Sequence, residues 1–205
     1  MLVLIKGAGD LATGTAVRLY RAGIKVVMTE VARPTAVRRT VAFSQCMYDG
    51  AAQVEGISAR RAEDAGAARR ALERGEVPVL CDPEAAILRE LPFDGVVDAI
   101  LAKRNLGTAI TDAPVVLALG PGFTAGVDCH GVVETMRGHN LGRLLTQGSA
   151  APNTGVPGDV GGYTTQRIIR APADGAFEPL AAIGQRVEEG QPVARVAGRT
   201  ACAQL

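Results

Sequence analysis

The chain opens with an apolar run that ends in a glycine-rich turn and continues as a helical pattern. Residues 2–5 read Leu-Val-Leu-Ile, and the turn that follows is Gly7-Ala8-Gly9. Small and apolar residues then recur at helical spacing until Gly23, a residue typical of a helix end. A buried strand, a Gly-x-Gly turn and a helix start in this order predict the phosphate-binding unit of a dinucleotide site.

The residues of the turn and of the first helical turn have distinct expected roles in that unit. Gly7 permits the tight turn, and Gly9 lets the backbone approach a pyrophosphate. Ala12 stands where a third small residue allows the helix to pack on the strand. Asp10 and Leu11 begin the helix whose N-terminus faces the phosphates. The alternative is an ordinary strand–turn–helix connection that binds no nucleotide.

Charged residues follow the second predicted strand, at residues 25–29. Glu30 lies about 20 residues after the turn, where such folds place a carboxylate on a ribose hydroxyl. Arg33, Arg38 and Arg39 come soon after, where guanidinium groups bind a 2′-phosphate or another anion. A solvated basic loop is the alternative. Because a carboxylate and arginines occur together, the pattern leaves NAD and NADP equally open.

Strands and helices alternate along the first 120 residues. The pattern predicts a β-hairpin around Asp49-Gly50, helices at 61–74 and 84–91, and strands at 77–81, 95–101 and 115–119. This alternation is typical of an α/β fold with a Rossmann-like parallel sheet, followed here by a β-rich C-terminal region. Gly is abundant in that later region, which favours turns and short strands.

Ligands of such sheets bind beyond the carboxyl ends of the strands. We therefore expect the first glycine turn, Glu30, Cys81 and residues 98–103 to lie along one edge of the sheet. Gly120 and Gly122 form a second glycine turn after a strand and are further candidates for cofactor binding. Cys81 is a candidate reactive thiol, and a packed strand-end cysteine is the alternative because no basic residue adjoins it.

Both histidines of the chain, His130 and His139, fall in a polar block near Asp128 and Glu134. They are candidates for an acid–base pair. Their spacing matches no standard zinc motif, so no metal is expected. The block is better interpreted as a site for an anionic ligand, with a hairpin of solvated charges as the alternative.

We predict three regions. Residues 1–120 form the dinucleotide-binding domain, residues 121–158 a β-rich polar block and linker, and residues 159–205 an incomplete β-barrel. The last region resembles the first half of a biotinyl or lipoyl barrel through Ala-Pro-x-x-Gly, Ile-Gly-x-x-Val and Gly-Gln-x-Val. No lysine follows Val196, so no covalent biotin or lipoate is expected. A half barrel exposes unpaired strand edges, so we expect it to be completed by another chain or to be shortened.

Composition excludes several classes of function. A net charge of +1 gives no overall attraction to nucleic acid or to an anionic membrane. No apolar run reaches the ~18 residues of a transmembrane helix. The four cysteines lie far apart with no Cys-x-x-Cys pair, which favours a reduced, cytoplasmic chain.

Several motifs together resemble the selenium-dependent molybdenum hydroxylase accessory proteins. These are residues 5–14, 120–123, 128–130, 133–135, 137–139 and 141–143, and the terminal half barrel. The resemblance implies a cytoplasmic maturation factor whose partners are a molybdenum hydroxylase and a small-molecule cofactor. We also expect a homo-oligomer. The cofactor would be of the dinucleotide type, either molybdopterin dinucleotide or NAD(P). The glycine turn would hold its pyrophosphate, and the block at 128–143 would hold an anionic pterin end.

Two other functions stay open. One is an NAD(P)-dependent oxidoreductase in which Gly7, Gly9 and Glu30 bind the cofactor and His130 or His139 donates a proton. The other is a scaffold that docks the hydroxylase through residues 150–205.

Overall fold

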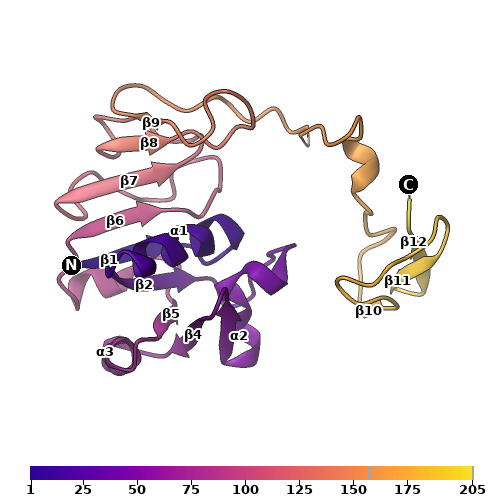
Figure 1. Cartoon of the computed structure of the whole chain (residues 1–205), viewed down its shortest axis with the longest axis horizontal. Helices are drawn as coiled ribbons and strands as arrows, with labels where there is room; N and C mark the ends of the chain where they lie inside the picture. Colours follow the sequence, from indigo (N-terminus) through magenta and orange to yellow (C-terminus); the bar gives the residue numbers. More distant parts are fainter. Residues whose placement is uncertain (157, 205) are drawn as a thin grey trace. The chain divides into compact units, whose positions relative to one another are not determined.

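Strand β1 (Leu2–Lys6) lies at the centre of a nine-stranded sheet in the computed structural model (Figure 1). The structure describes residues 1–156 and 158–204, which divide into the units Met1–Asn153 and Thr154–Leu205. Pro157 of the predicted linker and Leu205 at the end of the predicted barrel lie outside the described residues.

The remaining elements follow in chain order. They are α1 (Asp10–Arg21), β2 (Lys25–Glu30), η1 (Arg39–Val41), η2 (Phe43–Gln45), α2 (Cys46–Asp49), β3 (Ala51–Val54), β4 (Ile57–Ala62), α3 (Ala65–Glu73), β5 (Val77–Cys81), η3 (Ala86–Arg89), β6 (Gly95–Asp98), β7 (Val115–Leu119), β8 (Gly131–Val133), β9 (Leu144–Leu145), η4 (Thr165–Arg167), β10 (Phe177–Pro179), β11 (Pro192–Val196) and β12 (Arg199–Cys202).

The strand order of the large sheet is β3-β4-β5-β2-β1-β6-β7-β8-β9. All strands from β4 to β8 in this order pair in parallel, and only the outermost strands, β3 and β9, are antiparallel to their neighbours. The strand order reverses at β1, between β2 on one side and β6 on the other. Dinucleotide-binding sheets bind their ligand at this reversal, outside the carboxyl ends of the strands. The structure therefore confirms the predicted α/β class with a Rossmann-like sheet.

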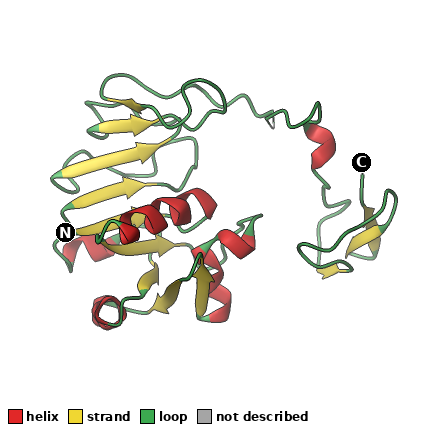
Figure 2. Cartoon of the chain, in the orientation of Figure 1, coloured by secondary structure: helices red, strands yellow, loops and turns green. Residues whose placement is uncertain are grey.

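Apolar residues cover both faces of this sheet. On one face, helix α1 lies across the strands (Figure 2). Its residues Ala12 and Ala16 share a buried cluster with Ile5 and Met28, and all four are fully buried. On the other face, α3 and η3 pack on residues such as Val96. Small side chains in α1 let the helix approach the strands closely, so the glycine turn before it is held on a rigid support.

The hairpin predicted around Asp49-Gly50, with strands at 41–44 and 53–57, is wrong, because residues 41–44 form no strand and a different hairpin lies in this region. Asp49-Gly50 ends the short helix α2, where Gly50 has the left-handed conformation (φ +78°) common after a helix. The hairpin is β3–β4, and it turns at Glu55 and Gly56, both at positive φ, as a two-residue type I′ turn requires.

Two predicted helices are shorter than expected. Residues 57–62 form β4, which pairs in parallel with β5, and α3 starts only after Asp64, whose carboxylate caps the Ala67 amide at 2.6 Å. The helix predicted at 84–91 is reduced to the 3₁₀ turn η3. Ala85 has a left-handed conformation (φ +53°), which interrupts a helix that starts at residue 84, and the Asp82 carboxylate accepts the amides of Ala86 and Ile87.

Residues 121–153 belong to the first unit, although the sequence pattern set residues 121–158 apart from the sheet. Strand β8 extends the sheet beyond β7, and β9 pairs back on β8. In the second unit, β10, β11 and β12 form an antiparallel sheet, which confirms the β-rich C-terminal region. Ala197 and Gly198, both at positive φ, form the tight turn between β11 and β12.

Candidate functional site

The candidate site lies at the carboxyl edge of the large sheet, which we define as the edge formed by the C-terminal ends of the parallel strands. Gly7 follows β1 at this edge and has φ +94°, a conformation that side-chain-bearing residues rarely adopt. A Cβ atom at Gly7 would lie 3.0 Å from the carbonyl oxygen of Ala99, the residue that follows β6. Gly7 is therefore needed both for the turn and for close contact with the end of the neighbouring strand.

Gly9 differs from Gly7 because neither its backbone conformation nor a close contact requires a glycine there. Its backbone has φ −65°, and a Cβ atom built there would meet no atom within 4 Å. The amides of Gly9 and Asp10 donate to no acceptor within residues 1–156 and 158–204. These amides begin the 12-residue helix α1, whose dipole favours an anion at this end. Open space, free amides and the helix dipole at one point fit a pyrophosphate.

The turn is held in this conformation by residues that the sequence analysis did not single out. The Thr13 hydroxyl donates to the Ala8 carbonyl oxygen at 3.2 Å, and the Ser44 amide donates to the same oxygen at 2.8 Å. The Phe43 amide in turn donates to the Thr13 hydroxyl at 2.9 Å. A hydroxyl on the buried face of a helix that starts at a glycine turn is the signal that could have identified Thr13.

Glu30 contacts the glycine turn directly. Its Oε2 accepts the Ala8 amide at 3.0 Å, and its Oε1 accepts the Val31 amide at 2.8 Å. Of the arginines that follow, Arg38 forms an ion pair with Asp10. Arg33 and Arg39 are exposed, and neither forms an ion pair within the described part of the chain.

Leu11 is 43% exposed beside this ion pair, and its amide donates to the carboxylate of Asp10 at 2.9 Å. Ala12, by contrast, is fully buried against the sheet. The four residues after Gly9 are thus divided between the surface of the candidate site and its support.

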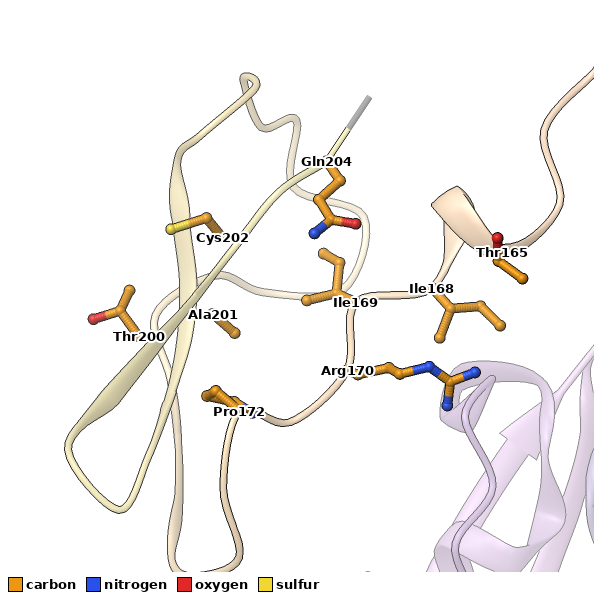
Figure 3. A pocket seen from close by; sticks show the side chains of 9 residues that line it. All are labelled: Thr165, Ile168, Ile169, Arg170, Pro172, Thr200, Ala201, Cys202 and Gln204. Carbon is orange, nitrogen blue, oxygen red and sulfur yellow. The ribbon is translucent and has the colours of Figure 1, made fainter.

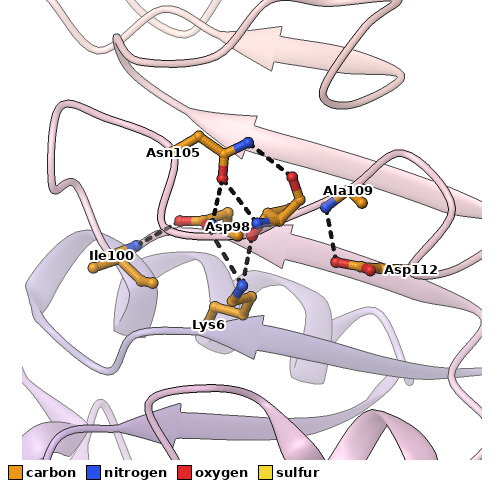
Figure 4. Close-up of polar contacts among 8 residues, drawn as sticks. Lys6, Asp98, Ile100, Asn105, Ala109 and Asp112 are labelled. Carbon is orange, nitrogen blue, oxygen red and sulfur yellow. Dashed lines mark hydrogen bonds and ion pairs between the residues drawn. The ribbon is translucent and has the colours of Figure 1, made fainter.

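A buried polar network lies where β1 and β6 end (Figure 4). Lys6 and Asp98 are register partners on these strands, and their side chains are only 4% and 2% exposed. The Lys6 Nζ donates to the Thr108 hydroxyl at 2.6 Å, and that hydroxyl donates to Asp98 Oδ2 at 2.6 Å. The Lys6 ammonium lies 4.0 Å from the same Asp98 oxygen. The hydroxyl of Thr108 therefore bridges a buried ion pair.

This network fixes the loop at residues 99–108, which we call the β6 loop. Asp98 accepts the Ile100 amide at the start of the loop, and Asn105 forms three hydrogen bonds with Gly107 and Thr108 at its end. Between these points, Leu101 and Lys103 have φ values of +60° and +62°. Such conformations cost about 1–3 kcal/mol each in residues other than glycine, so the surrounding contacts must hold them.

The second glycine turn supports the β6 loop. A Cβ atom at Gly122 would lie 2.5 Å from the Arg104 amide nitrogen, and one at Gly120 would lie 2.7 Å from the Thr135 hydroxyl. Protein atoms therefore fill the space beside both glycines, whereas the space beside Gly9 is open. Gly120 and Gly122 reach the carboxyl edge, and there they pack against neighbouring backbone and side chains.

The three candidate catalytic residues do not come together. Cys81 is exposed at the carboxyl edge and is the register partner of Glu30. His139 is exposed in the connection after β8, at the same edge. His130 precedes β8 and accepts the Val116 amide on its Nδ1 at 3.0 Å, so it lies at the amino ends of the strands. The length of β8, about 10 Å, separates the two histidines.

The polar block at 128–143 is divided in the same way. Asp128 lies on the His130 side of β8, and its carboxylate accepts the Thr124 amide at 2.7 Å. Glu134 lies on the His139 side and is buried. Burial raises the pKa of Glu134, but hydrogen bonds from the amides of Ala151, Met136 and Thr135 outweigh it and hold the pKa below its ordinary value.

Two other cysteines are buried and are poor nucleophiles. Burial raises the pKa of the Cys46 thiol to about 11, and burial also raises the pKa of the Cys129 thiol. Within residues 1–156 and 158–204, no group of three or more His, Cys, Asp or Glu side chains is arranged to hold a metal ion. The helices in this part of the chain include none with the length and apolar character needed to cross a membrane.

The second unit contains a hollow of about 390 Å³ between residues 165–172 and β12 (Figure 3). Its lining residues include Ile168, Ile169, Arg170 and Cys202. All of its lining residues belong to the second unit, so this hollow is a feature of that unit alone.

A known protein is similar in sequence to this chain over most of the chain's length. The chain is similar to the uncharacterized protein YqeB of Escherichia coli strain K12, with 54% identity over 193 residues. The similar region covers 94% of this chain and 36% of YqeB, so the chain spans about a third of the length of that curated relative. No family model matches the chain, and no solved structure matches it.

Proposed function

We propose that the first unit binds a dinucleotide-type cofactor across the crevice between the ends of β1 and β6. The observation that carries this proposal is the open glycine turn at the strand reversal, where Gly9 leaves free space and the Gly9 and Asp10 amides have no protein acceptor. A pyrophosphate supplies oxygens for these amides and takes the position that a side chain would otherwise fill.

We further propose that the chain is part of a cytoplasmic accessory protein that serves the maturation of a selenium-dependent molybdenum hydroxylase. The motifs at 5–14 and 120–123, which resemble those of such accessory proteins, both lie at the carboxyl edge in this fold. A maturation protein needs to hold the cofactor and release it to the hydroxylase, and a glycine turn with open space beside it at the surface supports both steps. The cofactor in this proposal is molybdopterin dinucleotide, with NAD(P) as the other dinucleotide that fits the turn.

Titration of the purified chain with molybdopterin dinucleotide, NAD and NADP tests cofactor binding. The informative variant is Gly9→Asp, because the backbone at Gly9 accepts any residue and the added side chain enters open space. Its carboxylate would repel the pyrophosphate, so we expect at least a tenfold loss of affinity. Gly14→Asp is the matched control, since Gly14 is in the same helix, is also open, and lies beyond the turn.

The possible results of this titration lead to different conclusions about the proposed site. Binding that Gly9→Asp weakens at least tenfold and Gly14→Asp preserves supports the proposal, provided that both variants keep the wild-type circular dichroism spectrum. If all three dinucleotides fail to bind, or if both variants bind them like the wild type, the proposed cofactor site is wrong. Co-purification of the hydroxylase with the tagged chain tests the maturation role separately.

A second candidate function is an NAD(P)-dependent oxidoreductase, and the position of Glu30 favours it. The carboxylate of Glu30 lies against the Ala8 amide of the turn, where a ribose hydroxyl of an adenine dinucleotide would be bound. Such an enzyme transfers hydride, so a dehydrogenase screen with NAD and NADP should show turnover that Gly9→Asp removes.

A further inference from the structure

The two sides of the strand reversal differ in exposed charge at the carboxyl edge. On the β6 side, the β6 loop carries Lys103 and Arg104, and the connection after β8 carries Arg137 and Arg143. All four cations are exposed, and none forms an ion pair within residues 1–156 and 158–204.

The carboxylates on this side do not compensate for these cations at the surface. Asp98 is buried with Lys6 and Thr108, and Glu134 is buried among backbone amides. The exposed charge of the β6 loop and of the connection after β8 is therefore positive. An anion that approaches this side meets cations with no competing carboxylate in either segment.

The β6 loop is also rigidly placed. Its two ends are fixed by Asp98 and Asn105, and Gly122 contacts the backbone at Arg104 so closely that no side chain fits between them. Lys103 sits at positive φ within this framework. Because the backbone of this loop is already held in place, it loses little conformational entropy when the loop binds a ligand. This favours the binding of an anion by the cations of the loop.

A dinucleotide lies across the strand reversal with one nucleotide on each side. With the pyrophosphate at Gly9 and a ribose at Glu30, the second half of the ligand lies over the end of β6. We infer that this second half carries a phosphate or an equivalent anionic group, and that Lys103 and Arg104 bind it. The inference rests on the proposed dinucleotide site and narrows the ligand class, because a nicotinamide ring offers no negative charge to these cations.

A matched pair of ligands tests this inference: ADP-ribose and ADP-ribose 1″-phosphate. The two share the adenosine and the pyrophosphate and differ by one phosphate on the second ribose. We expect isothermal titration of the full chain to show about tenfold tighter binding of the phosphorylated ligand, a typical effect of charge-assisted hydrogen bonds. The double variant K103Q/R104Q should lose this preference and keep the wild-type affinity for ADP-ribose.

The double variant R186Q/R199Q is the control for net charge, since it removes two exposed cations from the second unit. It should keep the preference for the phosphorylated ligand. If the wild type binds the two ligands with equal affinity, the inference is wrong. The proposed dinucleotide site is still supported in that case, because both ligands bind. If neither ligand binds, the dinucleotide site and the inference both fail.

Thr108 supplies a second test, because it positions the β6 loop without being exposed to the ligand. Thr108→Val removes the bridging hydroxyl and should reduce the preference for the phosphorylated ligand, whereas Thr108→Ser keeps the hydroxyl and should restore it. A preference that is unchanged in Thr108→Val overturns the positioning role of the buried network.

Discussion

Two ion pairs at the carboxyl edge differ in how far their side chains are exposed to water. Asp10 and Arg38 form a surface pair beside the glycine turn, with side chains 27% and 68% exposed. Lys6 and Asp98 form a buried pair where β1 and β6 end, and Thr108 bridges them. Water screens the first pair, so a ligand can replace either partner at little cost, whereas the second pair lacks water and depends on its own geometry.

This difference indicates that the two ion pairs have different roles. The surface pair lies beside the glycine turn, where a ligand would contact it, and water can take the place of either partner. The buried pair holds the β6 loop and leaves the loop's own cations, Lys103 and Arg104, exposed. The surface pair can therefore exchange its partners, whereas the buried pair holds a fixed arrangement.

The largest expected effect is that of breaking the buried pair. Asp98→Asn leaves the Lys6 ammonium buried without a charged partner and should lower the free energy of unfolding by about 3 kcal/mol. Asp10→Asn removes the surface pair and should cost less than about 1 kcal/mol. Urea denaturation followed by circular dichroism measures both. Equal losses in the two variants would contradict the distinction between the pairs.

A smaller effect is expected from the two glycines of the turn. Gly7→Ala forces a side chain into positive φ and places its Cβ 3.0 Å from the Ala99 carbonyl oxygen, so it should cost about 2 kcal/mol. Gly9→Ala meets neither constraint and should change the unfolding free energy by less than about 0.5 kcal/mol. The same denaturation experiment would reject this view if Gly9→Ala proved the more damaging change.

The smallest effect concerns Glu134, which ties the connection after β8 to Ala151. Its folded-state pKa is lowered, so its stabilising contribution is complete above the unfolded-state pKa of about 4.5 and disappears as the pH falls through the folded-state value. Glu134→Gln should therefore cost about 1.5 kcal/mol at pH 7 and progressively less below pH 4.5. Thermal unfolding of both proteins from pH 7 to pH 3 checks this. A difference between them that stays constant with pH would refute the assignment.

Local patterns in the sequence were sufficient to predict the α/β class, the first strand, turn and helix, and the position of Glu30 at the same edge of the sheet. The reason is that the glycine spacing, the apolar run and the helix stop are all determined by neighbouring residues. The same local reasoning misplaced the hairpin turn at Asp49-Gly50, because a glycine after a short helix and a glycine in a hairpin have the same backbone conformation.

The sequence by itself thus determined the strand, glycine turn and helix start at which we propose phosphate binding, since the helix start and its preceding glycines are contiguous. Only the tertiary structure decided which glycine is open, that β8 separates His130 from His139, and that Lys6, Asp98 and Thr108 share one buried network. Lys6 and Thr108 are 102 positions apart in the chain, and their contact arises only because β1 and β6 become neighbours in the sheet. Pairing between distant strands, which no local pattern encodes, places the ends of β1 and β6 side by side at the glycine turn.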